Sequence, residues 1–378
     1  MKIIYDIDGF FSPANMSTDH KLISVDLDQQ PFDSLFEQYY LGLRSAMFIC
    51  EDTIKEENKA LEVMRTWRET SVKSAMNYVY RHTKSGQVLS PDFIWIIQTA
   101  TIDELKNKYP EVVNIQLRVS MKPRLSARVV SKNIVTFPAL ARTVLNHYNI
   151  VLINSIFRDI SEDEQISVEP DRRNIARFMF PYLLFCHGDF SVQNLPMICA
   201  YSADALNIAM QLTNLQMLFI FAHEYAHILL QHFENTDINS STKMRIENEA
   251  DLFALKVVLG HVEKNNSYSK LAAFTAIRWL FKYQLLEESV GILIRGGKLD
   301  FSESKFEERR GEFQAELFKN HGLSGSSLLE TRGFYILVEL QSILYNYGPE
   351  FINHIIDKVN ESKKTGVIEP WWKEITNK

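Results

Sequence analysis

A mainly apolar run from Thr213 to Phe233 contains neither proline nor glycine. A run of this length without helix-breaking residues predicts a buried α-helix. A second helix is predicted from Ser241 or Thr242, either of which can cap its start, to Gly260 as its stop. Helical periodicity also occupies residues 33–50, 53–82, 102–109, 139–148, 267–289, 328–346 and 349–360. We therefore expect a mainly helical chain.

A few segments have the hydrophobic pattern of strands. Residues 112–119 place apolar side chains at every second position, which predicts a half-buried strand. Strands are also predicted over residues 2–5, 121–135, 150–157 and 195–201. Segment 121–135 is basic, but a solvated strand face explains its lysines and arginines more simply than a contact with nucleic acid does. Few strands among many helices predict an α+β fold that is mainly helical.

The first predicted helix contains the motif His-Glu-x-x-His, formed by His223, Glu224 and His227. Because the two histidines are four positions apart, their imidazoles lie one above the other on a single helix face. Two imidazoles so placed can share one Zn2+ at about 2.0–2.1 Å each, with the glutamate as a candidate base. His232 is turned about 140° away from the pair, which favours a surface position or a place behind the ligands. The motif still needs a third protein ligand.

Candidates for the third ligand lie on the second predicted helix. Glu247 and Asp251 are four residues apart and share a helix face with Ala250 and Ala254. An inward-facing carboxylate beside alanines fits a close approach of two helices around a metal ion. Glu249 is the alternative ligand, although it projects about 200° around the helix from Glu247.

These two motifs together resemble a known group of enzymes. His-Glu-x-x-His followed by Glu-Asn-Glu-Ala-Asp-Leu-Phe-Ala (residues 247–254) is similar to the gluzincin metallopeptidases. The nearest motifs are those of the ImmA/IrrE family and of the HtpX-type and CAAX-processing proteases. The phage-exclusion Lit-type peptidases are a looser comparison, based on His-Glu-Tyr-x-His. The resemblance covers about forty of the 378 residues, so it identifies a site and not a whole protein.

The resemblance implies a zincin-like metallopeptidase core with an active-site helix. It also implies three Zn2+ ligands from the two helices: His223, His227 and Glu247. Glu224 would be the general base, and Asp251 would hold the distal nitrogen of a ligand histidine. In gluzincins an edge strand near the active-site helix pairs with the extended substrate, and segments 150–157 and 195–201 are both candidates for that strand.

Composition limits the cellular compartments and the classes of binding partner that we expect. The net charge of −6 and the pI near 6.0 argue against general binding to nucleic acid or to anionic membranes. Three cysteines without a Cys-x-x-Cys pattern suit a reducing compartment. No signal peptide is expected, and the apolar stretches Phe178–Cys186 and Met217–Ala222 are too short to span a bilayer. We therefore expect a cytoplasmic protein without a membrane span.

The sequence thus predicts a soluble zinc-dependent endopeptidase that cleaves a protein substrate, and the resemblance implies a regulatory, stress-related or phage-related role. Residues 1–135 are expected to form an accessory or substrate-selecting region, and residues 136–378 the catalytic region with C-terminal helices. The alternative is a metal-stabilised interaction or sensor protein without proteolytic activity. The segment 187–194 also matches the catalytic loop of aminoglycoside-phosphotransferase-like kinases, but the Gly-rich loop that a kinase needs is not evident.

Overall fold

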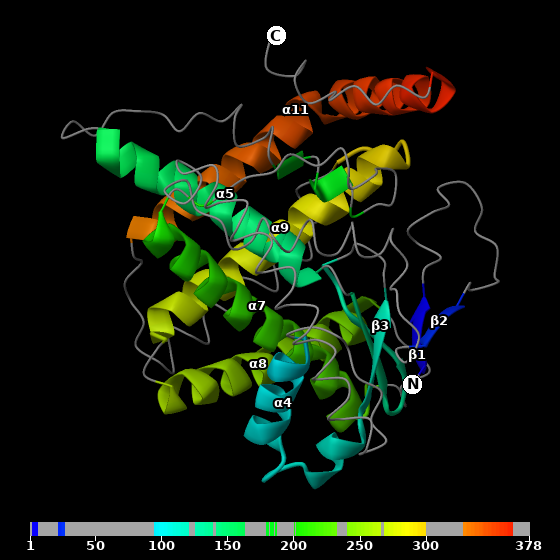
Figure 1. The fold of residues 1–378 in the computed structure, drawn as a ribbon, viewed down its shortest axis with the longest axis vertical. Helices are drawn as coiled ribbons and strands as arrows, with labels where there is room; N and C mark the ends of the chain where they lie inside the picture. The colour runs from blue at the N-terminus through cyan, green and yellow to red at the C-terminus, as the bar shows by residue number, and fades with distance from the viewer. Residues whose placement is uncertain are drawn as a thin grey trace.

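The structure is a computed structural model in which the chain is mainly helical with few strands, as predicted (Figure 1). It describes residues 2–6, 22–26, 94–120, 125–138, 141–162, 179–180, 182–184, 186, 200, 202–232, 240–265, 268–299 and 328–365. The predicted helices over 33–50 and 53–82, the kinase-like motif at 187–194 and most of the predicted strand 195–201 lie outside the described residues.

Helix α7 (Ala203–Leu229) lies at the centre of the helical part. The helices packed around it are α4 (Ile94–Leu105), α5 (Ala141–Glu162), α8 (Ser240–Lys264) and α9 (Lys270–Ile294). A last long helix, α11 (Leu328–Thr365), packs on α9 and α5 on the side away from α8 (Figure 1). Because α7 has neighbours on several sides, its middle section belongs to the hydrophobic core.

Local sequence explains where α7 starts and why it is buried. The hydroxyl of Ser202 accepts a hydrogen bond from the Ala205 amide at 3.1 Å, which caps the first turn. From Leu215 to Ala222 every side chain is buried, as expected of a helix that is apolar all round. By length and composition α7 could also cross a membrane, which the short apolar stretches in the sequence had not indicated. Most of its apolar window, 67%, is however buried inside the fold.

The predicted strand over residues 150–157 is wrong, because α5 continues as one helix through it. Asn149 explains the helical register: its side-chain amide donates to Thr213 and to Gln216 of α7, both at 2.9 Å. Its carbonyl oxygen accepts a hydrogen bond from Tyr283 of α9, also at 2.9 Å. Since α5 is buried on several faces, its β-branched residues show no helical period, and a short apolar run of this kind resembles a buried strand.

Two residues that normally end helices lie inside them. Gly260 is within α8 and does not end it, and a Cβ there would come within 3.3 Å of the Glu104 carboxylate on α4. The glycine therefore allows a close approach of two helices. Pro349 lies inside α11, which joins the predicted helices 328–346 and 349–360 into one.

The five described strands form one sheet in the order β2-β1-β3-β5-β4. Their bounds are β1 Lys2–Asp6, β2 Leu22–Asp26, β3 Gln116–Ser120, β4 Arg128–Ser131 and β5 Ile134–Pro138. Strands β1, β3 and β5 run parallel, whereas β2 and β4 pair antiparallel with β1 and β5. The predicted strand 112–119 begins later, at β3, because Pro110–Asn114 forms a 3-10 turn. The division at residue 135 stays a prediction, and β5 spans that position.

Among the described strands the sheet ends at β4, which contacts helix α7. The register of β4 against β5 shifts between Val129 and Ser131, so the pairing of this strand is irregular there. The outermost described strand on this side of the sheet therefore lies beside the central helix.

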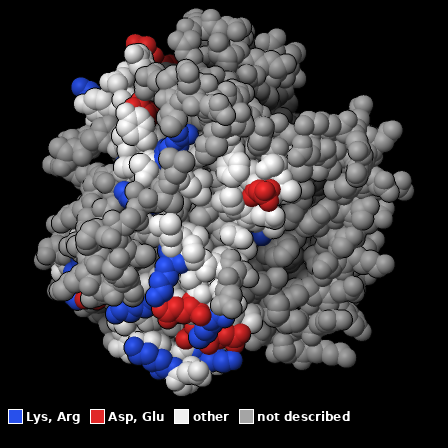
Figure 2. Space-filling view, turned by 90° about the vertical axis from the view of Figure 1, so that its left-hand side faces the viewer, with Lys and Arg blue, Asp and Glu red and all other residues white. Residues whose placement is uncertain are grey.

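Ion pairs connect the helices on the surface near the ends of α4, α8 and α9. Lys264 of α8 lies 2.5 Å from Glu104 of α4, and Lys270 of α9 lies 2.7 Å from Glu263. On the face drawn in Figure 2, positive and negative side chains of the described residues lie side by side in the lower part. Surface pairs of this kind contribute little to stability.

Replacing Gly333 with alanine is expected to destabilise the fold. A Cβ at this buried position of α11 would lie 2.0 Å from Cζ2 of Trp279, whose ring is fully buried on α9. Overpacking of this kind costs about 1–3 kcal/mol of unfolding free energy, which outweighs the helix propensity that alanine adds. Urea denaturation measures the change, with Val338→Ala on the exposed side of α11 as the control. A Gly333→Ala chain as stable as the unchanged one would contradict the α9–α11 packing.

Candidate active site

Three predicted metal ligands come together where α7 meets α8. The Nε2 atoms of His223 and His227 lie 3.1 Å apart. Glu247 places one carboxylate oxygen 3.5 Å from Nε2 of His223 and the other 3.9 Å from Nε2 of His227. The three side chains offer ligand atoms within 4.8 Å of one another and could hold a metal ion. The helical spacing of the histidines and the close packing of α8 on α7 together produce this arrangement.

Asp251 lies behind His223, one helical turn after Glu247. Its Oδ1 atom is 2.9 Å from Nδ1 of His223, and only 2% of Asp251 is exposed. The structure thus places Asp251 on the ring nitrogen of His223 that faces away from His227 and Glu247. A carboxylate in this position fixes the orientation of the imidazole.

The electrostatics of the two histidines differ. Burial by itself lowers the pKa of His223, but its contacts with Asp251 and Glu247 and the charges of Asp251 and Glu224 outweigh burial and raise the pKa to about 10. Burial lowers the pKa of His227 to about 4, and the neighbouring charge of His223 adds to this effect. The acids around His223 and the burial of His227 therefore shift the pKa values of the two imidazoles in opposite directions.

Another group of residues lies behind His227. Its Nδ1 atom is 2.9 Å from Nδ1 of His232, a residue that is only 7% exposed. Nε2 of His232 lies 3.2 Å from Glu249, which in turn forms an ion pair with Arg245. The structure therefore places Glu249 against His232 and Arg245. Glu247 lies instead against the Nε2 atoms of the two clustered histidines.

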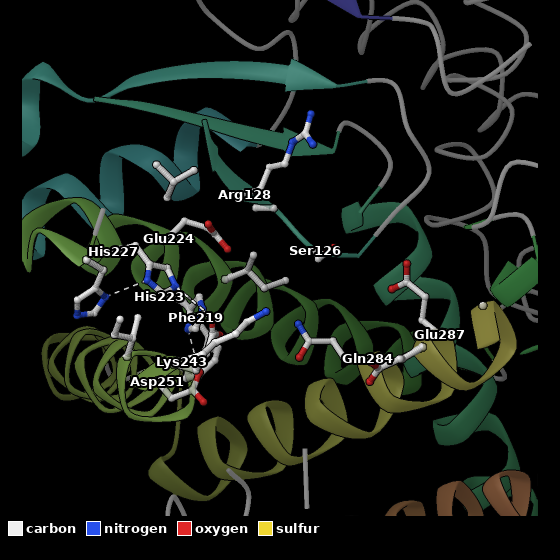
Figure 3. Close-up of a pocket in the computed structure, with 18 of the residues that line it drawn as sticks. Ser126, Arg128, Phe219, His223, Glu224, His227, Lys243, Asp251, Gln284 and Glu287 are labelled. Carbon is white, nitrogen blue, oxygen red and sulfur yellow. Dashed lines mark hydrogen bonds and ion pairs between the residues drawn. The ribbon is translucent and has the colours of Figure 1, made fainter. Parts of the chain in front are cut away.

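A pocket of about 920 Å³ opens beside these side chains (Figure 3). Glu224 lines it, is 8% exposed and extends from α7 toward the side on which Arg128 of β4 lies. Helix α9 forms another wall with Gln284 and Glu287, and Lys243 of α8 extends into the space (Figure 3). The pocket is therefore an open cavity with a buried carboxylate next to the three clustered side chains.

The sequence did not indicate the residues that β4 and α9 bring to this pocket. Segment 150–157, one of two candidates for a substrate-pairing strand, is helical and cannot have that role. Of the described strands, β4 lines the pocket, through Arg128 and Val129. Its basic, β-branched sequence indicated a strand but contained no signal for its position, because the pairing with β5 and the contact with α7 are tertiary features.

Comparison with known proteins bears on the same region. Residues 192–291 match the family model described as Peptidase U49. The matched segment contains α7, α8 and most of α9, and therefore every side chain of the three-residue cluster. Neither a curated protein nor a solved structure matched the chain. The match over residues 192–291 supports a peptidase that acts on a protein substrate.

Proposed function

We propose that the chain is a zinc-dependent endopeptidase of the gluzincin type with a zincin-like core. The observation that carries this proposal is the convergence of two imidazoles and one carboxylate next to a buried glutamate in an open pocket. The zinc ligands would be His223, His227 and Glu247. The cytoplasmic location and the regulatory role belong to the same proposal.

The geometry of the three side chains fits zinc. Ligand atoms that lie 2.0–2.1 Å from a tetrahedral zinc are about 3.3 Å apart from one another. The two Nε2 atoms lie 3.1 Å apart, and Glu247 presents one oxygen 3.5 Å from His223 and its other oxygen 3.9 Å from His227. Binding of one metal ion through a single oxygen therefore requires the carboxylate to turn, since one ligand atom from each residue lies within 4.8 Å of the others. Two nitrogen ligands and one carboxylate are also a donor set of catalytic zinc sites, which keep one position open.

When bound, zinc supplies a Lewis acid that polarises the scissile carbonyl and lowers the pKa of water. Glu224 follows His223 directly and lines the pocket, so its carboxylate can take the proton from an attacking water. The same carboxyl group can then deliver the proton to the leaving amine. Asp251, 2.9 Å from Nδ1 of His223, would orient this imidazole so that its Nε2 atom stays directed at the metal position.

The edge strand β4 is proposed to bind the substrate. The sheet ends at β4 among the described strands, and β4 lines the pocket beside Glu224. An extended peptide can add to such an edge through main-chain hydrogen bonds. This arrangement would hold the scissile bond across the pocket between β4 and α7.

Replacing Asp251 with asparagine is expected to weaken zinc binding by about 10–100-fold, because partners of this kind orient the ligand histidine and raise its basicity. The measurement is competition for Zn2+ with a chromophoric chelator. Asn248→Asp on the same helix tests whether charge alone matters. An unchanged affinity in Asp251→Asn would show that Asp251 does not position His223.

Peptide hydrolysis and its dependence on metal test the proposed function. Purified protein is incubated with a peptide library and the products are identified by mass spectrometry, before and after treatment with a zinc chelator. We expect cleavage that stops when the metal is removed and returns when Zn2+ is added. Cleavage that survives complete metal removal would contradict zinc dependence. Zinc binding without cleavage of the library or of co-expressed proteins would favour the interaction or sensor alternative.

A further inference from the structure

We propose that His232 and Glu249 form a positioning pair for the ligand His227, so that both ligand histidines are oriented by acids of helix α8. This inference rests on the proposed function, since it concerns the same metal site. His223 is held directly by Asp251, whereas His227 would be held by Glu249 through the ring of His232. The pair consists of positioning residues, because neither side chain belongs to the cluster of three ligand atoms.

The contacts form a continuous chain from the cluster to the surface. His227 and His232 face each other through their Nδ1 atoms at 2.9 Å, and His232 reaches Glu249 with Nε2 at 3.2 Å. Arg245 pairs with the second carboxylate oxygen of Glu249, one helical turn before it on α8. The ring of His232 is buried, while Arg245 is exposed, so the chain leads from the interior to solvent.

The positions of the hydrogen atoms on His227 and His232 follow from which nitrogen of His227 binds the metal. Nε2 of His227 faces His223 and Glu247, so a metal ligand must present its lone pair there. The hydrogen of the neutral ring must then be on Nδ1, which donates to Nδ1 of His232. His232 in turn carries its own hydrogen on Nε2 and donates it to Glu249. The order of donors therefore selects the tautomer of His227 that a metal requires.

The backbone after α7 brings His232 into this position. If α7 continued as a helix, His232 would be about 140° around the axis from His227. Instead Gln231 has a φ of 57°, in the left-handed region that non-glycine residues rarely adopt. The chain turns directly after the helix, and the imidazole of His232 comes back against the last turn of α7. The left-handed turn at Gln231 and the buried contact between His227 and His232 both indicate that His232 has a defined position behind His227.

A purely structural role is the competing explanation, in which His232 and Glu249 only connect the end of α7 to α8. The two explanations predict different effects of Glu249→Gln on zinc affinity. An amide oxygen still accepts a hydrogen bond from His232 Nε2, although the ion pair with Arg245 is lost. A positioning role predicts that Glu249→Gln retains zinc affinity and that Glu249→Ala does not.

Zinc affinity of the full-length chain tests the proposal, measured by competition with a chromophoric chelator. We expect His232→Ala and Glu249→Ala each to weaken Zn2+ binding by about tenfold, the lower end of the effect of such partners. The double variant should be no weaker than His232→Ala alone, because the two residues act through one contact. Glu249→Gln should lie near the unchanged chain. His261→Ala is the matched control and should bind normally, because His261 is a partly buried histidine of α8 that also lies near an acid, Glu104.

The outcomes separate this proposal from the proposed function. If the unchanged chain binds zinc and His232→Ala binds it as tightly, the positioning role is overturned and the zinc site remains. Thermal unfolding shows whether His232→Ala folds. If it does not fold, the two Glu249 variants decide, and equal zinc affinities of Glu249→Ala and Glu249→Gln overturn the proposal. An unchanged chain that binds no zinc overturns both.

Discussion

Replacing Glu224 with alanine is expected to reduce peptide hydrolysis by at least about 10²–10⁴-fold, the contribution of a positioned general base. Zinc should stay bound, because Glu224 is not one of the three clustered ligand residues. Its side chain lines the pocket beside the cluster, and the residue is only 8% exposed. The expected phenotype is therefore a folded, metal-loaded and inactive chain.

Two measurements on the same sample check this expectation. Elemental analysis gives the zinc content per chain, and mass spectrometry of a peptide digest gives the activity. Glu263→Ala on α8 is the control, since it removes an exposed carboxylate that pairs with Lys270. Loss of zinc from Glu224→Ala would contradict the role assigned to Glu224, and so would undiminished cleavage.

Replacing Glu247 with alanine is expected to weaken zinc binding by more than about 100-fold, beyond the usual effect of residues that only orient ligands. The reason is that Glu247 supplies the carboxylate that faces both imidazoles, at 3.5 and 3.9 Å. Glu249→Ala should have a much smaller effect, since Glu249 contacts His232 and Arg245 instead. The two variants remove the same chemical group from the same helix, two residues apart.

Chelator competition on the two variants gives the ranking directly. Urea denaturation of the metal-free proteins shows whether either change also destabilises the helices. If Glu249→Ala lost zinc more completely than Glu247→Ala, the role of third ligand would pass to Glu249.

The clustering of His223, His227 and Glu247 could be predicted from the sequence because a helix has a regular repeat. Residues four positions apart share a helix face, as His223 and His227 do on α7 and Glu247 and Asp251 do on α8. The flanking alanines Ala250 and Ala254 are fully buried, as the close approach of the helices requires. Local periodicity therefore carries most of the information about this cluster.

The other features depend on tertiary contacts that have no local signature. His232 reaches His227 only because Gln231 adopts a left-handed turn, which nothing in the residue type of a glutamine indicates. Strand β4 lines the pocket because it pairs with β5 and packs on α7. Residues 150–157 were predicted as a strand because an apolar, β-branched run has the same pattern in a buried helix.

The most direct test of the central claim is the position of the metal in a crystal of the zinc-loaded protein. Anomalous scattering at the zinc edge locates the ion independently of any assumption about its ligands. We predict one peak at about 2.0–2.2 Å from Nε2 of His223, Nε2 of His227 and a carboxylate oxygen of Glu247. A peak elsewhere, or a Glu247 side chain turned away from the ion with no other acid in its place, would contradict the account.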